Sequence, residues 1–161
     1  MSPKAPAPAR PVEPAFVASL SQLFEERIVF NTLLGLKVTE LSGERVCCGI
    51  DMRPELIGHY QHQRLHGGVI SAVLDATAGL AVMAAIGARH MDEPPEQRLA
   101  RFAKLGTIDL RIDYLRPGVG PHFRAEAQVL RLGSRVASTR MAFHGADGGL
   151  LATGAAAYIV S

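Results

Sequence analysis

A run of apolar residues from Gly67 to Gly87 constrains the fold of this chain more than any other segment. The run is long enough to span a membrane, but it is rich in Ala and Gly and carries Asp75 near its middle. A central Asp costs about 2.5–3.5 kcal/mol on insertion scales. A helix that is apolar all round is typical of a protein interior. The run therefore predicts a helix that starts at His66-Gly67-Gly68, ends near Ile86 and is buried on every side, and we expect no membrane partner.

Hydrophobic periodicity predicts the elements around this helix. They are a helix over Ala15–Val29, a turn over Asn31–Gly35, a hairpin of Leu36–Leu41 with Glu44–Met52, a polar loop over Ile57–Leu65, a charged connection over His90–Arg101 with a helical turn after Pro95, and strands over Thr107–Leu115, Phe123–Leu130, Arg135–Phe143 and Leu150–Val160. In the first of these four strands Thr107 belongs to the polar, odd-numbered positions. We expect the four strands to form a meander, and the whole to be an α+β fold with an antiparallel sheet wrapped around the apolar helix.

Composition limits the classes of protein to which the chain can belong. Its 161 residues are about the length of one domain. We assign that domain to 15–161 and expect 1–14, rich in Pro and Ala, to be a flexible tail. The net charge of +2 makes nucleic acid a poor partner. We see no secretory signal and expect a cytoplasmic protein. Cys47 and Cys48 point to opposite faces of a strand and have no metal-ligand spacing, so we expect two half-buried free thiols and no metal site.

Asp75 is the candidate functional residue with the strongest physical argument. On a helix it shares a face with small side chains, and the bulkier Val69, Val73, Leu80 and Met83 lie opposite. The small neighbours are Gly68, Ser71, Ala72, Ala78, Gly79 and Val82. Burying an unpaired carboxylate is costly. Two interpretations stay open: a structural carboxylate in a close-packed contact, or a reactive carboxylate beside space for a ligand.

The glycine pair at the start of the same helix suggests a second functional group. The first N–H groups of a helix have no partner inside it, and the helix dipole favours negative charge there. Such N–H groups can polarise an acyl carbonyl, although His66 more often caps or packs than catalyses. Gly67 and Asp75 are eight residues apart, about 12 Å along the helix, too far to meet at one carbonyl. A catalytic site would therefore need two antiparallel helices across a two-fold axis, and we expect a homodimer with shared sites.

Several motifs follow one another along the chain: His66-Gly67-Gly68 with Asp75 nine positions after the His, the strand GTIDLRIDYLRPG over Gly106–Gly118, RLGSR over Arg131–Arg135, and the ending Ala155–Tyr158. Together they resemble the hotdog-fold, PaaI-like acyl-CoA thioesterases over roughly Phe30–Val160, and within that family the bacterial YigI-type medium- and long-chain enzymes. The resemblance implies a hotdog fold with an extra N-terminal helix. It also implies hydrolysis of acyl-CoA to fatty acid and CoA, no cofactor because CoA enters with the substrate, and a homodimer that pairs into a tetramer in some relatives.

The family pattern also implies roles for individual residues. Asp75 would be the general base or the nucleophile, the Gly67 N–H would polarise the thioester carbonyl, and Thr107 would orient the water or the carboxylate. The other candidates would bind substrate, mostly its CoA part: Tyr60, His66, Gly68, Tyr114, Arg131, Gly133, Ser134 and Arg135. Two interpretations of Arg131 and Arg135 stay open. They could bind the phosphates of CoA, or they could be solvated charges at strand ends.

One departure concerns the Asn that relatives place six or seven residues before the His of His-Gly-Gly. Here Tyr60 and His59 occupy those positions. An imidazole can donate a hydrogen bond to a carbonyl and titrates near neutral pH, so we expect His59 to be the substitute, ahead of His62. The departure equally fits a protein that binds acyl-CoA without hydrolysing it, or a thioesterase for aromatic, phenylacetyl-type acyl-CoA.

Overall fold

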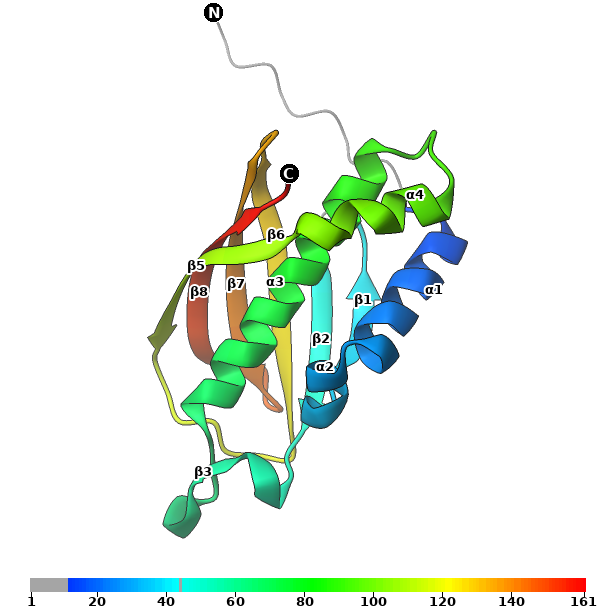
Figure 1. Cartoon of the computed structure of the whole chain (residues 1–161). Helices are drawn as coiled ribbons and strands as arrows, with labels where there is room; N and C mark the ends of the chain where they lie inside the picture. Colours follow the sequence, from blue (N-terminus) through cyan, green and yellow to red (C-terminus); the bar gives the residue numbers. More distant parts are fainter. Residues whose placement is uncertain (1–11, 44) are drawn as a thin grey trace, which may run out of the picture.

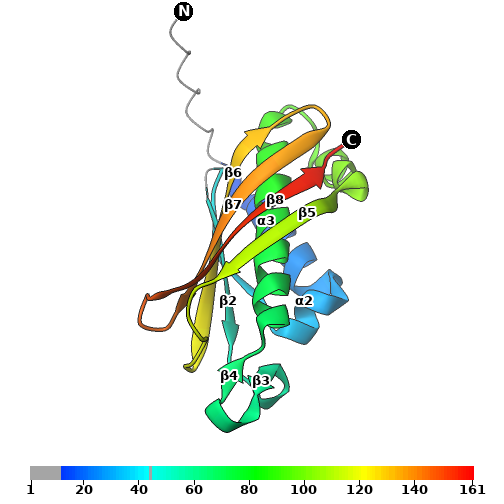
Figure 2. The same cartoon turned by 90° about the vertical axis from the view of Figure 1, so that its left-hand side faces the viewer.

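A six-stranded antiparallel sheet curves around one long helix, α3 (Gly67–Arg89), in the computed structural model, which describes residues 12–43 and 45–161 (Figures 1 and 2). Across the sheet the strands follow the order β1 (Lys37–Leu41), β2 (Val46–Asp51), β6 (His122–Leu132), β7 (Val136–Gly145), β8 (Leu150–Ile159) and β5 (Gly106–Tyr114). The predicted α+β arrangement of an antiparallel sheet around one apolar helix is confirmed. The predicted hairpin of the first two strands is also confirmed.

The order of the last four strands differs from the predicted meander. Only β6, β7 and β8 follow one another as hairpins, and β5 lies at the sheet edge beside β8 rather than beside β6. The connection after β5 crosses the end of the sheet, where the Gly118 carbonyl accepts from Leu65 N–H and the Pro121 carbonyl from Met52 N–H. This crossover lets β6 pair with β2, and it leaves β5 on the free edge seen in Figure 2.

The sheet covers only one side of α3. Apolar side chains from that side fill the core, among them Ile70, Val73, Leu74 and Leu80. The opposite face stays half-exposed at Ala72, Asp75, Ala76, Gly79 and Met83. The prediction of a helix buried all round was therefore wrong, and so was the prediction that Met83 lies opposite Asp75. By length and composition α3 could cross a membrane, but 61% of its most apolar stretch is buried against the rest of the chain. That burial fits the core helix of a globular domain.

Three short helical segments form a layer beside α3: α1 (Pro14–Gln22), the π-helical turn η1 (Leu23–Arg27) and α2 (Val29–Leu34). The predicted N-terminal helix is confirmed, but the predicted turn over Asn31–Gly35 is wrong, because helix resumes after Ile28 and ends at Gly35 with φ of +69°. The Asn31 side-chain amide donates to the Phe24 carbonyl at 3.0 Å. This bond holds η1 and α2 together at the break.

The N-terminal layer makes close contact with α3 at Gly87. A Cβ atom on Gly87 would lie only 2.2 Å from the ring of Phe16, so a side chain there would displace the ring. Phe16 also packs 4.2 Å from the guanidinium of Arg98, which is 1% exposed on α4 (Pro95–Ala100), the predicted helical turn after Pro95. The Nη2 of Arg98 lies 2.6 Å from the Glu13 carboxylate. Of the predicted 1–14 tail, 1–11 lies outside the described residues.

The polar loop predicted over Ile57–Leu65 contains a short hairpin. It consists of β3 (Ile57–His59), the 3-10 turn η3 (Tyr60–His62) and β4 (Arg64–Leu65). Two other 3-10 turns, η2 (Pro54–Leu56) and η4 (Arg101–Lys104), precede β3 and β5, respectively. A Cβ atom on Gly58 would lie 2.7 Å from the Cα of His66. The hairpin is therefore packed against the start of α3.

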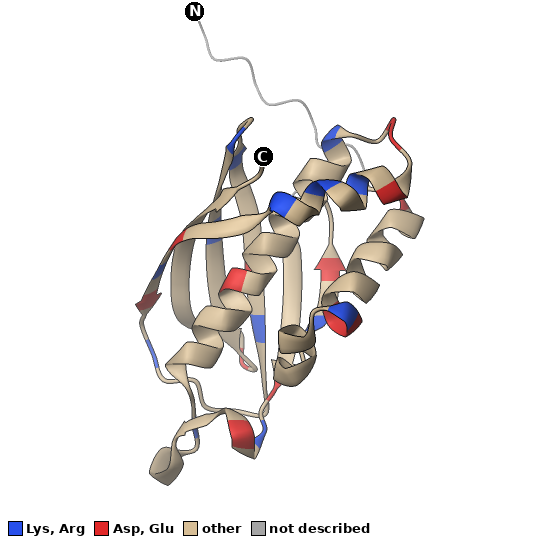
Figure 3. Cartoon of the chain, in the orientation of Figure 1, with Lys and Arg blue, Asp and Glu red and all other residues tan. Residues whose placement is uncertain are grey.

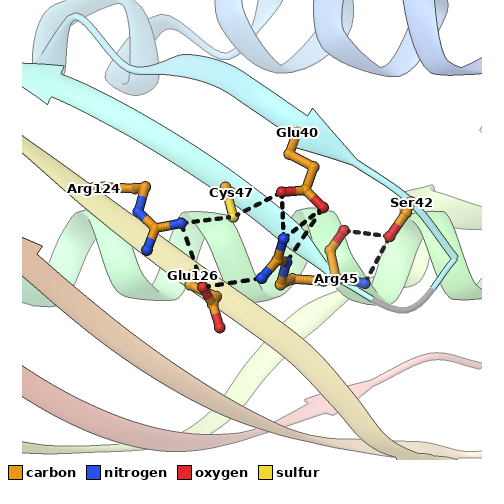
Figure 4. A network of polar contacts seen from close by, with 6 residues as sticks. All are labelled: Glu40, Ser42, Arg45, Cys47, Arg124 and Glu126. Atoms are coloured by element: carbon orange, nitrogen blue, oxygen red, sulfur yellow. Dashed lines mark hydrogen bonds and ion pairs between the residues drawn. The ribbon is translucent and has the colours of Figure 1, made fainter. Parts of the chain in front are cut away.

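The two cysteines are free and point to opposite faces of β2, as predicted, but both are fully buried rather than half-buried. Cys48 faces the core, and burial raises the pKa of its thiol to about 12. Cys47 lies on the outer face, between Glu40 and Arg124, each 3.7 Å from its Sγ (Figure 4). There the side chain of Arg45 bridges the carboxylates of Glu40 and Glu126, which ties β1, β2 and β6 together.

Candidate active site

Asp75 is the one acidic residue of α3 and gives the single red segment of that helix in Figure 3. It lies on the half-exposed face of the helix. Two hydroxyl groups donate to the same carboxylate oxygen, Oδ1: Thr107 Oγ1 at 2.9 Å and Tyr158 Oη at 2.8 Å. Among the described residues no donor bonds the other oxygen, Oδ2. The carboxylate is thus held in a fixed orientation through one of its two oxygens.

A β-bulge brings Thr107 to this position. In the register of β5 against β8, Thr107 lies opposite Tyr158 and Asp109 opposite Ala157, so Ile108 is the extra residue. Thr107 therefore faces α3 together with Leu110, and the predicted placement with the outward polar positions was wrong. Bulges often re-aim a side chain beside an active site. The same bulge leaves Ile108 57% exposed on the sheet edge.

Tyr158 is a member of the site that the sequence did not reveal. Its hydroxyl also lies 2.9 Å from the backbone carbonyl of Asp75, so it fixes both the side chain and the helix turn that carries it. Burial, and next the charge of Asp75, raise the pKa of Tyr158 far above its usual value. The phenol therefore remains a hydrogen-bond donor throughout the physiological range.

The start of α3 exposes one backbone donor. The Gly68 N–H is taken by its N-cap, His66, whose Nδ1 accepts at 2.8 Å. His66 is thus a capping residue in this chain, with its ring proton on Nε2. For the Gly67 N–H, the described residues offer no acceptor. The Gly67 carbonyl accepts from Tyr114 at 2.9 Å, and Tyr114 also bonds Ser71, so Tyr114 anchors this turn.

The remaining predicted site residues lie in two other places, neither of them beside Asp75 of the same chain. His59 and Tyr60 are exposed in the β3–β4 hairpin at the N-terminal end of α3, and the His59 ring centre is 4.8 Å from that of His62. Gly133 and Ser134 turn the β6–β7 hairpin and line a cleft of about 480 Å³ with Arg89, Arg101 and Lys104. Arg131 and Arg135 are exposed on either side of that turn.

A groove of about 340 Å³ runs beside the Asp75 carboxylate. It lies between α3, the N-terminal helical layer and the start of β5, and its lining is mostly apolar. Pockets that hold small organic ligands have volumes of about 300–1,000 Å³ and a few polar groups in apolar walls. In the described part of the chain, no three His, Cys, Asp or Glu side chains are placed to hold a metal.

Comparison with known proteins agrees with this architecture. The profile of the Thioesterase superfamily matches residues 62–152, which include α3 and most of the sheet. The chain belongs to the thioesterase superfamily. It is 35% identical over 141 residues to the medium/long-chain acyl-CoA thioesterase YigI of Salmonella typhimurium, across 88% of this chain and 91% of that protein, and 34% identical to the Escherichia coli K12 protein of the same name, with equal coverage.

A solved structure shows the same fold. The crystal structure of a protein from Shewanella oneidensis related to the thioesterase superfamily is 38% identical, with a TM-score of 0.85 over 93% of this chain and all of that one. The predicted hotdog fold, with its N-terminal helix and single long apolar helix, is therefore confirmed. Membership of the superfamily makes the chain a thioester hydrolase.

Proposed function

We propose that this protein is a cytoplasmic acyl-CoA thioesterase that hydrolyses medium- or long-chain acyl-CoA to free fatty acid and CoA. The observation that carries the proposal is the Asp75 carboxylate, held through one oxygen by Thr107 and Tyr158 and opening on an apolar groove. Its sequence relatives in Salmonella and Escherichia are named for this substrate class. CoA enters as part of the substrate, and the chemistry needs no other cofactor.

In the proposed reaction Asp75 acts through its free oxygen, Oδ2. As a general base it takes a proton from water while the water oxygen bonds to the thioester carbon. As a nucleophile it bonds to that carbon itself, and water then hydrolyses the mixed anhydride. In both routes the C–S bond breaks and the CoA thiolate takes up a proton. In a single turnover in ¹⁸O-water, label in the Asp75 carboxylate would show the nucleophilic route with water attacking the Asp75 carboxyl carbon, because the general-base route places the label in the fatty acid alone.

The carbonyl oxygen develops negative charge in either route, and we assign its stabilisation to the Gly67 N–H of a second subunit. That donor is about 12 Å from Asp75 along its own helix, so it cannot serve the same carbonyl within one chain. The strand β3, which ends at His59, lies at the same end of α3 as Gly67. In this scheme His59 too would reach the carbonyl from the second subunit.

The edge strand β5 supports a dimer of this kind. An uncovered edge strand readily pairs with another chain, and β5 exposes Ile108 and Tyr114, with Leu115 directly after it. Pairing β5 with its copy across a two-fold axis would continue the sheet and set the two α3 helices antiparallel. Light scattering tests the dimer, and a pairing of two dimers into a tetramer would appear as twice that mass.

The cleft at the C-terminal end of α3 suits the phosphates of CoA. Three cations of the chain line it, namely Arg89, Arg101 and Lys104, and the predicted residues Arg131 and Arg135 flank its hairpin wall. Glu93 neutralises part of this charge through its ion pair with Arg101. We therefore expect Lys104→Ala to raise KM for acyl-CoA with little effect on kcat.

The test of the proposed function is thiol release from a panel of acyl-CoA esters, from acetyl to palmitoyl together with phenylacetyl and benzoyl. Asp75→Asn should abolish turnover, whereas the control Asp51→Asn, an exposed Asp outside the site, should not. A preference for the aromatic esters would replace the proposed substrate class. Tight binding without turnover of any ester would show a protein that binds acyl-CoA and does not hydrolyse it.

A further inference from the structure

The groove beside Asp75 has a definite direction. Along α3 its floor consists of residues one turn apart, Asp75, Gly79 and Met83, which share a face of the helix. Phe24 and Ile28 of the N-terminal layer form the opposite wall. The groove therefore leads from the carboxylate toward the C-terminal half of α3.

The far end of this path is closed in two steps. Met83 is the first large side chain that a ligand would meet, since Gly79 has none. One turn further, at Gly87, the ring of Phe16 occupies the place of a side chain and contacts the helix directly. Phe16 is fully buried, so it forms a fixed wall behind the flexible Met83.

The lining indicates what the groove accepts. At the polar end, Thr107 and Tyr158 both donate to the Asp75 carboxylate. The other polar residue of the lining, Asn31, donates its amide to the Phe24 carbonyl. Beyond the reacting end the walls are therefore apolar, and they suit a hydrocarbon chain whose carbonyl lies at Asp75.

We infer that Met83 sets the acyl-chain length that this protein prefers, with Gly79 keeping the path open; the inference rests on the proposed thioesterase function. Eight residues of helix from Asp75 to Met83 span about 12 Å. An extended hydrocarbon advances about 1.25 Å per carbon, given C–C bonds of about 1.5 Å at tetrahedral angles. The path to Met83 thus accommodates about nine or ten carbons. The further turn to Phe16 would accommodate about five more.

The test compares the dependence of kcat/KM on chain length, from butyryl- to palmitoyl-CoA, in four proteins. Each profile is scaled to the same protein's rate on butyryl-CoA. In the wild type kcat/KM should rise up to about fourfold for each buried methylene and level off near decanoyl-CoA. In Met83→Ala, kcat/KM should continue to rise for up to five carbons beyond decanoyl-CoA. In Gly79→Leu, kcat/KM should stop rising at a chain of about five carbons, because the new side chain fills the path.

Met52→Ala is the matched control, since Met52 is equally half-buried but lies outside the groove, and its profile should overlay the wild type. Gly79→Leu should fold, because a Cβ there meets only the Tyr158 ring at 3.8 Å and Leu favours helix over Gly. If both groove variants hydrolyse acyl-CoA with the wild-type profile, the length assignment is wrong and the proposed function stands. If the wild type hydrolyses no acyl-CoA, the proposed function fails, and this inference fails with it.

Discussion

The sharpest prediction concerns one backbone hydrogen atom, the N–H of Gly67. Proline at this position removes it without breaking α3, because Gly67 is the first residue of the helix and its N–H has no acceptor in the described chain. His66 has φ of −66° and ψ of 133°, which is the conformation that a residue before proline prefers. Gly67→Pro therefore tests the donor and leaves the helical hydrogen bonds in place.

The expected loss follows from the role proposed for that N–H. Removing one donor from an oxyanion site costs about 10²- to 10³-fold in kcat, or roughly 2.7–4 kcal/mol. Gly67→Ala is the control, since it keeps the N–H and its Cβ would contact the Tyr114 ring at an ordinary 3.4 Å. The assay is steady-state thiol release, with thermal unfolding measured alongside. A kcat for Gly67→Pro within tenfold of that for Gly67→Ala would refute the assignment.

The same variant tests whether the site is shared between subunits. A purified heterodimer of an Asp75→Asn chain and a Gly67→Pro chain has one site with both groups intact and one with neither, if each site draws on two chains. It should show about half the wild-type activity, although both parent homodimers are nearly inactive. If Asp75 and Gly67 acted within one chain, the heterodimer would have no intact site and would stay inactive.

Three further predictions follow from single contacts. Thr107→Val and Tyr158→Phe each remove one bond to the Asp75 carboxylate, of about 1.5–3 kcal/mol, so kcat should fall roughly tenfold to a hundredfold, and Thr107→Ser should retain most of it. The Cys48 thiol has its pKa raised from 9.0 to about 12, so the unfolded chain loses this proton first as pH rises. Stability should thus be full below pH 9 and about 2 kcal/mol lower at pH 10.5, and denaturant titrations of Cys48→Ala should lack this component. Arg98→Ala should lower the free energy of unfolding by about 2–3 kcal/mol, because packing against Phe16 is lost. Arg98→Met should leave it nearly unchanged in the same titration, because Nε and Nη1 of the buried guanidinium have no partner among the described residues.

Local patterns in the sequence were enough to predict most of the elements. The alternation of Phe123, Ala125, Ala127 and Val129 gives β6 its inward face, and the apolar run gives α3 its length. Those patterns do not show which element packs against each face of a helix or strand. The sequence put Asp75 among small side chains on one face of α3, but it left open whether that face packs closely against another element or lines a groove.

The functional residues also differ in how far the sequence could predict them. Asp75 was predictable because an isolated acid in an apolar helix needs a physical reason, and Gly67 because helix starts expose donors. His66 as a cap was the more ordinary of its two predicted roles, and the structure has it in that role. The catalytic and substrate-binding roles of the other residues stay predictions, His59 among them, until the variants are measured.

The missed residue, Tyr158, and the wrong strand order have one cause. A meander would have placed β6 beside β5 and left two strands, β6 and β7, between β5 and β8, so Tyr158 could not have lain opposite Thr107. The observed order makes these two residues direct neighbours across β5 and β8, and the bulge at Ile108 turns the Thr107 hydroxyl toward the helix. Only this combination lets the hydroxyl groups of Thr107 and Tyr158, from two strands far apart in the sequence, reach one oxygen of Asp75. The orientation of the carboxylate is therefore a property of the crossover between β5 and β6, which no short segment of the sequence encodes.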